Sequence, residues 1–247
     1  VPDEKELRST SFHMLRDEVY FEKAKGVSTL TSTRALSINR KEKTVQVKNV
    51  NSGEQQTIGY DKLLLATGSE PVILPIPGVD LDGVFTISNL HKAIEIKDRI
   101  AKGLVGKAVV VGGGAIGIEM AEALKDLWGV ETTLVEFKDQ LLPNLVDWEM
   151  ADMLARHLRE NDIDVFLGEG AEEIVADDDG RACGVRTSQR TIDTDLVIMA
   201  AGERPRSSLA AEAGLHVSEM GAIVVNEHMQ TSDPDIYAAG DCVEIVN

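Results

Sequence analysis

The spacing of apolar residues predicts two kinds of structure along the chain. The first thirty residues are polar and favour helix, and the following stretch carries β-branched segments separated by turn residues such as Asn51-Ser52-Gly53. This alternation is typical of short strands, and those expected are Ser28–Asn39, Lys43–Asn49, Gln56–Gly59 and Leu63–Ala66. The first three predict an antiparallel meander, and Pro71, Pro75 and Pro77 predict an extended connector after it.

From residue 89 the pattern changes to strands that alternate with amphipathic helices. The expected helices are Leu90–Lys102, Ala115–Leu127 and Trp148–Asn161, and the expected strands are Ala108–Val111, Thr132–Phe137, Ile163–Leu167 and Leu196–Ala200. A hairpin of Glu172–Ala176 with Cys183–Thr187 is expected before the last of these strands, and Ala222–Val225 and Ile236–Ala239 are expected after it. Strands and helices that alternate at this spacing predict a parallel sheet with right-handed crossovers.

The predicted fold class is therefore α/β, with a Rossmann-like parallel-sheet domain inserted into a second domain that contains the antiparallel meander. Boundaries are expected after residues 85 and 214, so that 1–85 and 215–247 belong to the second domain and 86–214 to the inserted one. Two apolar strands end alike, in Ala66-Thr67-Gly68 and in Ala200-Ala201-Gly202. This similarity indicates two related dinucleotide-binding halves without a true sequence repeat.

The charge and hydropathy of the chain argue against two classes of partner, nucleic acids and membranes. The formal net charge is −17, from 42 acidic and 25 basic residues. Such a charge repels nucleic acid unless a local basic patch overcomes it, and the sequence shows none. The apolar runs are too short to span a bilayer, and no basic-then-apolar leader opens the sequence. We therefore expect a cytoplasmic protein that binds neither nucleic acid nor membrane.

The two cysteines, Cys183 and Cys242, are 59 residues apart, and neither has a spacing typical of metal ligands. The five histidines are isolated from one another in the sequence. We expect no metal site and no structural disulfide. Cys183 is expected on a strand and Cys242 in a packed interior.

The strongest motif is the run from Gly112 to Gly117, which matches G-x-G-x-x-G between an expected strand and an expected helix. Gly112 permits a sharp turn, Gly114 lets the backbone approach a diphosphate, and Gly117 lets the helix pack close to the strand. The helix N-terminus then offers N–H groups and the positive end of its dipole to the phosphates. This combination predicts a site for NAD(H) or NADP(H). The alternative is a glycine-rich turn with a structural role only.

Glu136 lies nineteen residues after Gly117, at the end of the next expected strand. A carboxylate in this position accepts hydrogen bonds from the adenosine ribose hydroxyls and repels a 2′-phosphate, which favours NADH over NADPH. Lys138, two residues later, could weaken the preference for NADH over NADPH. The alternative for Glu136 is a surface glutamate with no ligand.

The resemblance to a known family is extensive. Tyr60–Ser69 resembles the segment that closes the first part of the flavin domain in the pyridine nucleotide-disulfide oxidoreductases, and Thr231–Asp241 resembles their second flavin motif. The inserted domain between them ends in Ala200–Pro205, in the order that the family shows. Residues 66–77 and 135–143 are most similar to the branch of coenzyme A-disulfide reductases, NADH oxidases and NADH-dependent persulfide or polysulfide reductases.

The resemblance implies FAD and NAD(P)H as cofactors. It places Asp241 at a ribityl hydroxyl of FAD and Glu119 near the nicotinamide and the flavin; the alternative for Glu119 is an ordinary exposed acid in the first helical turn. The residues expected to hold NAD(P)H are Gly112, Gly113, Gly114, Ala115, Ile116, Gly117, Glu119, Glu136, Phe137, Lys138 and Gly202. Those expected to contact FAD are Ala35, Thr67, Gly68, Gly240 and Asp241. No catalytic nucleophile is assigned.

The implied activity is that of a flavin-dependent oxidoreductase, which passes hydride from NADH through FAD to a small disulfide, persulfide or coenzyme A-linked sulfur acceptor. Two alternatives remain: a ferredoxin- or rubredoxin-type flavin reductase that uses no cysteine, and a non-enzymatic NAD-binding redox sensor. The family's first FAD cradle, redox cysteine region and C-terminal dimerisation domain have no match in these 247 residues. We therefore expect this stretch alone to bind FAD weakly or not at all, and the full-length protein to be a homodimer.

Overall fold

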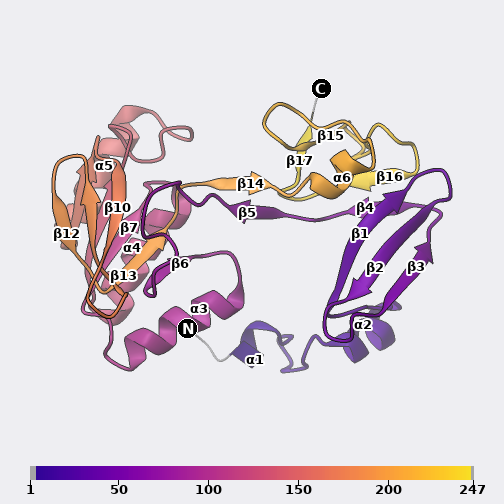
Figure 1. The fold of residues 1–247 in the computed structure, drawn as a ribbon, viewed down its shortest axis with the longest axis horizontal. Coiled ribbons are helices and arrows are strands. Elements are labelled where there is room, and N and C mark those ends of the chain that lie inside the picture. Colours follow the sequence, from indigo (N-terminus) through magenta and orange to yellow (C-terminus); the bar gives the residue numbers. More distant parts are fainter. Residues whose placement is uncertain (1–3, 246–247) are drawn as a thin grey trace. The chain divides into compact units, whose positions relative to one another are not determined.

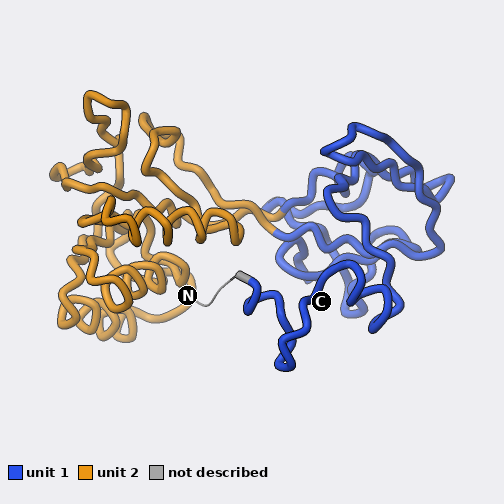
Figure 2. The backbone as a smooth tube through the Cα atoms, turned by 90° about the horizontal axis from the view of Figure 1, so that it is seen from below, with its two compact units in different colours: residues 1–68, 206–247 blue, residues 69–205 orange. Residues whose placement is uncertain are grey.

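The computed structural model describes residues 4–245 and forms two compact units (Figure 2). Unit 1 comprises residues 1–68 and 206–247, and unit 2 comprises residues 69–205. Unit 2 is therefore inserted, by sequence, into unit 1. Within the described range, no helix has both the length and the apolar character that a membrane crossing requires.

Unit 2 is built on a five-stranded parallel sheet with the strand order β6-β13-β7-β8-β9. Of these strands, Figure 1 labels β6, β7 and β13. The strands are β6 (Val84–Thr86), β7 (Lys107–Val111), β8 (Glu131–Glu136), β9 (Ile163–Leu167) and β13 (Leu196–Met199). The helices are α3 (Leu90–Ala101), α4 (Ala115–Trp128) and α5 (Trp148–Glu160). The predicted α/β fold class is confirmed, and except for β6, which the sequence analysis missed, these elements end within one residue of their expected bounds.

Alternate residues of the central strand β7 face two different layers. Val110 packs in one core cluster with residues of the helices, such as Ile118 and Ala155. Val109 packs in another cluster with Val185, which lies on an antiparallel sheet of β10 (Ala171–Ala176), β11 (Ala182–Thr187) and β12 (Thr191–Asp193). Because both faces of the strand are covered, its sequence is a continuous apolar run rather than an alternating one.

The boundaries of the compact units differ from those expected after residues 85 and 214. The connector belongs to unit 2, because β5 (Ser69–Pro71) pairs with β14 (Glu203–Pro205) and β6 forms the edge of the parallel sheet. The Pro77 carbonyl also accepts a hydrogen bond from the N–H of Ile174, at 2.9 Å. At the other boundary, α6 (Ser208–Glu212) places Ala210 in the core of unit 1. These contacts join distant residues, so local composition does not encode them.

Unit 1 contains the expected antiparallel meander, formed by β1 (Thr33–Asn39), β2 (Thr44–Asn49) and β3 (Gln55–Gly59). Two pairs of parallel strands accompany it: β4 (Leu63–Leu65) with β16 (Ile236–Ala238), and β15 (Ile223–Val225) with β17 (Val243–Ile245). The expected helical character near the start appears as α1 (Glu4–Leu7) and α2 (Glu18–Lys25). The buried core includes Ile38, Leu65, Leu215, Ile223 and Ile236.

Two aspartates join the meander to the segment that precedes β16. The Arg40 guanidinium lies 2.7 Å from Asp233, and the ammonium groups of Lys43 and Lys62 lie 2.6 and 2.7 Å from the two oxygens of Asp235. Hydrogen bonds from Lys43 and Lys62 lower the pKa of Asp235 to about 2 from its ordinary value of 3.8. The carboxylate form of Asp235 is therefore favoured by the folded state of unit 1.

This cluster predicts an acid-sensitive contribution to the stability of unit 1. Because the folded pKa of Asp235 is lowered, its contribution is complete above pH 3.8 and is lost as the pH falls through about 2. All three tyrosines lie in unit 1 and both tryptophans in unit 2, so each unit can be followed separately. We expect Asp235→Asn to flatten the pH dependence of urea unfolding seen by tyrosine circular dichroism, and to leave the tryptophan transition unchanged. An unaltered tyrosine transition between pH 3.8 and about 2 would contradict this account.

Candidate functional site

The glycine run forms a tight corner between β7 and α4. Gly112 has a φ of +118°, and a Cβ atom there would lie 2.2 Å from the carbonyl oxygen of Ala200. A Cβ atom on Gly117 would lie 1.9 Å from the carbonyl oxygen of Gly112. Both positions thus exclude a side chain because backbone approaches backbone, as the sequence analysis expected for a turn glycine and a helix-packing glycine.

The helix that follows this corner opens toward free space. Gly114 is the N-cap of α4 and provides no side-chain hydrogen bond to the first turn. No atom lies within 4 Å of the position that a Cβ atom on Gly114 would occupy. The first N–H groups of a helix have no intrahelical acceptor, so this helix end can receive the oxygens of an anion.

Glu136 ends β8 and is bound directly to the glycine corner. Its side chain is 9% exposed. One carboxylate oxygen accepts the N–H of Gly113 at 2.5 Å, and the other accepts the N–H of Lys138 at 2.7 Å. A carboxylate oxygen has two lone pairs, so each can accept a further bond from a ligand. The corner and the carboxylate, which the sequence analysis linked by their spacing, lie together.

A cleft of about 490 Å³ brings most of these residues to one place, at the carboxyl ends of the parallel strands. Ligands of open parallel sheets bind at this end. Of the predicted NAD(P)H residues, the cleft contains Gly112, Gly114, Glu136, Phe137, Lys138 and Gly202. A smaller cleft of about 200 Å³ contains Gly114, Ala115, Ile116 and Gly202, and extends to Glu203. Glu119 is exposed on α4, and neither cleft includes it.

The segment after β8 completes the corner, a structural role that its sequence did not indicate. The N–H of Leu142 donates to the carbonyl of Gly113 at 2.9 Å, and Leu141 is fully buried beside that glycine. Pro143 and Asn144 line the cleft. The Gly113 peptide is therefore held on both sides, by Glu136 at its N–H and by Leu142 at its carbonyl. Residues 135–143 stood out by resemblance to one branch of the family, but no local signal predicts the contact of Leu142 with Gly113.

Unit 1 brings its two predicted flavin segments together. β4 and β16 are neighbouring parallel strands, so Thr67 and Gly68 follow one carboxyl end, and Gly240 and Asp241 follow the other. Gly68 and Gly240 have φ angles of +67° and +85°, with open space at each Cβ position, and Asp241 is exposed. These segments fit one end of a cofactor site at the strand termini. Ala35 lies apart in the meander, exposed at a bulge of β1.

The cysteines are placed as the sequence predicted. Cys183 is half-buried on β11, and Cys242 is fully buried in the core of unit 1, with its sulfur 3.4 Å from the carbonyl oxygen of Ala239. Among residues 4–245, no three His, Cys, Asp or Glu side chains are arranged to hold a metal ion.

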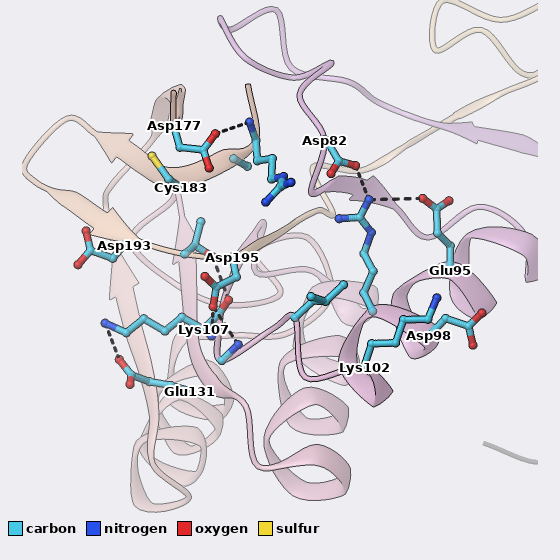
Figure 3. Close-up of a pocket in the computed structure, with 16 residues that line it drawn as sticks. Asp82, Glu95, Asp98, Lys102, Lys107, Glu131, Asp177, Cys183, Asp193 and Asp195 are labelled. Carbon is cyan, nitrogen blue, oxygen red and sulfur yellow. Dashed lines mark hydrogen bonds and ion pairs between the residues drawn. The ribbon is translucent and has the colours of Figure 1, made fainter. Parts of the chain in front are cut away.

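A larger cavity, of about 1010 Å³, lies at the opposite ends of the strands (Figure 3). Arg99 is paired there with Asp82 and Glu95. Asp195 accepts the backbone N–H groups of Gly106 and Lys107 at 2.8 and 2.9 Å. These charges are satisfied by the protein itself. Because the cavity contains no predicted site residue, we place the functional site in the smaller cleft beside Glu136.

Comparison with known proteins decides the family. The family model described as "Pyridine nucleotide-disulphide oxidoreductase" matches residues 1–247. The chain belongs to the pyridine nucleotide-disulphide oxidoreductase family. This confirms the family assigned by resemblance and its class of enzyme, the oxidoreductases.

Three proteins of known name illustrate what the chain is similar to. An NADH oxidase of Enterococcus faecalis is 41% identical over 206 residues, which are 83% of this chain and 45% of that protein. The structure of an NAD-dependent persulfide reductase from A. fulgidus is 40% identical with a TM-score of 0.93, covering 98% of this chain and 44% of the other. An FAD-dependent pyridine nucleotide-disulphide oxidoreductase from Desulfovibrio vulgaris is 42% identical with a TM-score of 0.82, covering 91% and 59%.

The chain spans about half the length of the curated relatives that it matches. These relatives are thus longer than the stretch described above. The cradle and Glu136 nevertheless lie entirely within unit 2, so their geometry can be tested in this chain.

The geometry of the glycine corner predicts a large loss of stability for one glycine-to-alanine substitution and a small loss for another. Gly112→Ala forces an L-residue into a left-handed conformation against a carbonyl oxygen, and we expect it to lower the free energy of unfolding of unit 2 by about 2 kcal/mol or more. Gly114→Ala has room and an extended φ of −80°, and should cost no more than about 1 kcal/mol. Urea unfolding followed by tryptophan fluorescence measures both. Equal losses in the two variants would contradict the geometry described.

Proposed function

We propose that the cleft of unit 2 binds NADH. The diphosphate would lie at the N-terminus of α4, over Gly114, and the adenosine ribose would lie at Glu136. The observation that carries this proposal is the hydrogen bond of 2.5 Å between Glu136 and Gly113, because it places the carboxylate and the cradle side by side in one cleft. A diphosphate and the ribose next to it need these two groups at that separation.

The charge of the cleft favours NADH over NADPH. Glu136 brings a carboxylate that is largely buried and held by two backbone N–H groups. A 2′-phosphate in the same place would face this negative charge at short range, and repulsion between buried like charges is weakly screened. Lys138 lies two residues after Glu136 and lines the same cleft. Its positive charge reduces the preference for NADH over NADPH without reversing it.

For unit 1 we propose a part in binding FAD. The turns at Thr67–Gly68 and Gly240–Asp241 follow neighbouring parallel strands, and the exposed carboxylate of Asp241 is available to a hydroxyl of the cofactor. Thr67 is itself fixed, because its hydroxyl donates to the carbonyl of Arg206 at 2.5 Å. The similarity to an FAD-dependent protein of the family supports this assignment.

For the whole protein we propose an NADH-dependent flavin oxidoreductase with a small sulfur compound, a disulfide or a persulfide, as acceptor. FAD, when bound, supplies the group that accepts hydride and passes the electrons on. The similarity to a persulfide reductase supports a sulfur acceptor, and the similarity to an NADH oxidase supports oxygen as a second candidate. We assign no redox role to Cys242, which is fully buried, or to Cys183, which lies outside both clefts.

The assignment of Glu136 predicts how a variant selects its cofactor. Glu136→Gln keeps one oxygen for Gly113 but removes the charge, and hydrogen bonds to charged groups are the stronger ones. We expect the Kd for NADH to rise about tenfold and the preference over NADPH to shrink. NADH fluorescence titration measures both constants. Gly114→Ala, which fills the space over the cradle, should lose binding of both cofactors, and an unchanged NADH-to-NADPH ratio in Glu136→Gln would disprove the role of the carboxylate.

The assignment of Asp241 is tested in the full-length protein. Asp241→Asn removes a charged acceptor, so we expect FAD to dissociate on dilution about tenfold more readily than from the parent. Fluorescence of released flavin after gel filtration measures this loss. Asp61→Asn, an exposed aspartate just before β4, is the control and should retain FAD. Equal retention by both variants would refute the role of Asp241.

A further inference from the structure

A buried carboxylate that the proposed function does not use borders the same cleft. Glu169 lies between β9 and β10, and its side chain is 3% exposed. One carboxylate oxygen is 2.8 Å from the guanidinium of Arg190, and the other accepts the hydroxyl of Thr187 at 2.9 Å. The same guanidinium lies 4.1 Å from the centre of the Phe166 ring. Each carboxylate oxygen of Glu169 thus has a partner within the protein.

The backbone around Glu169 continues directly from Glu136. The N–H of Glu169 donates to the carbonyl of Glu136 at 3.0 Å, and the carbonyl of Gly170 accepts the N–H of Ser188 at 3.1 Å. A Cβ atom on Gly170 would lie 3.0 Å from the Phe137 ring, so this ring rests on the glycine. Phe137 is 73% exposed and lines the cleft with Glu169 and Gly170.

These contacts place a wall at one end of the cleft, next to Glu136 and away from Gly202. The wall consists of the Phe137 ring and the backbone of Glu169–Ala171. If the ribose lies at Glu136 and the diphosphate at Gly114, the base attached to that ribose lies at this wall. An exposed aromatic ring that rests on backbone offers a flat apolar surface to such a base.

Arg190 stabilises this wall because it neutralises the buried carboxylate of Glu169. A carboxylate as buried as Glu169 is costly without a partner, and removing Arg190, whose own side chain is 43% exposed, leaves an uncompensated charge at Glu169. Arg190 lies on the turn between β11 and β12, so its ion pair with Glu169 links this turn to the wall of the cleft. Loss of Arg190 would drive Glu169 toward water and move Gly170 with it.

We propose that the Glu169–Arg190 pair is a positioning device for the adenosine half of the dinucleotide. This inference rests on the proposed binding of NADH and deepens it. Neither side chain needs to touch the ligand. The pair holds the Glu169–Ala171 backbone and the Phe137 ring in place, so that the base meets a preformed surface rather than one that must be ordered on binding.

The test uses the 247-residue chain with Arg190→Met, and with the double variant Glu169→Gln, Arg190→Met. The ligands are NADH and 5′-AMP, which shares only the adenosine half. We expect Arg190→Met to raise the Kd for both ligands by the same factor, about tenfold, because the buried carboxylate is left unpaired. The double variant removes that charge and should recover most of the affinity. Arg156→Met, an exposed arginine paired with Asp152 on α5, should bind both ligands as the parent does.

The outcomes separate the two proposals. A parent chain that binds neither ligand overturns the proposed function together with this inference. A parent that binds both, with Arg190→Met unchanged, overturns only the role of the pair. Thermal unfolding followed by tryptophan fluorescence identifies general loss of structure. If Arg190→Met and the double variant lose affinity equally at equal melting temperature, neutralising Glu169 is not what matters and the inference fails.

Discussion

The hydrogen bond from the N–H of Gly113 to the carboxylate of Glu136 is the contact on which the site depends. It joins the ends of two neighbouring strands, β7 and β8, at the point where each turns into a loop. Leu142 holds the other side of the same peptide. The corner is therefore fixed by the protein itself, and its orientation does not have to be created by a ligand.

The residues that line the cleft lie on two sides of this hydrogen bond, toward α4 and toward β10. Toward α4, the missing side chain of Gly114 leaves space over a helix end, which attracts anions because its N–H groups lack acceptors. Toward β10, the carbonyl of Glu136 accepts the N–H of Glu169, which in turn is paired with Arg190. One continuous set of hydrogen bonds thus runs along the cleft from Gly113 to Glu169. This continuity is the physical reason to assign a dinucleotide rather than a single phosphate group.

Much of unit 2 could be predicted from the sequence because its signals are local. The apolar run of β7, the glycines after it and the helical spacing of α4 lie within about twenty residues, and the parallel sheet follows from their order. Glu136 was found because a fixed distance separates it from the cradle. The two flavin segments were recognised by resemblance, and the pairing of β4 with β16 explains why they occur as a pair.

The parts that were missed depend on contacts between distant residues. Arg190 and Glu169 are on different turns, and no composition or period marks them as partners. Arg40 and Asp233, which are 193 positions apart, are a similar case. The prolines of the connector had indicated a boundary between the two units. The pairing of β5 with β14 and of β6 with β13 instead makes the connector part of unit 2. Tertiary pairing overrides a local signal there, because three residues are too few for a recognisable period.

The most direct test of the account is hydrogen–deuterium exchange of the chain with and without NADH. Binding of NADH at the glycine corner should slow exchange of the backbone of Gly112–Ile118 and of Glu136–Lys138, with little change around the large cavity beside Arg99 and Lys107. Slower exchange confined to that cavity, or no change at the glycine corner under saturating NADH, would contradict it.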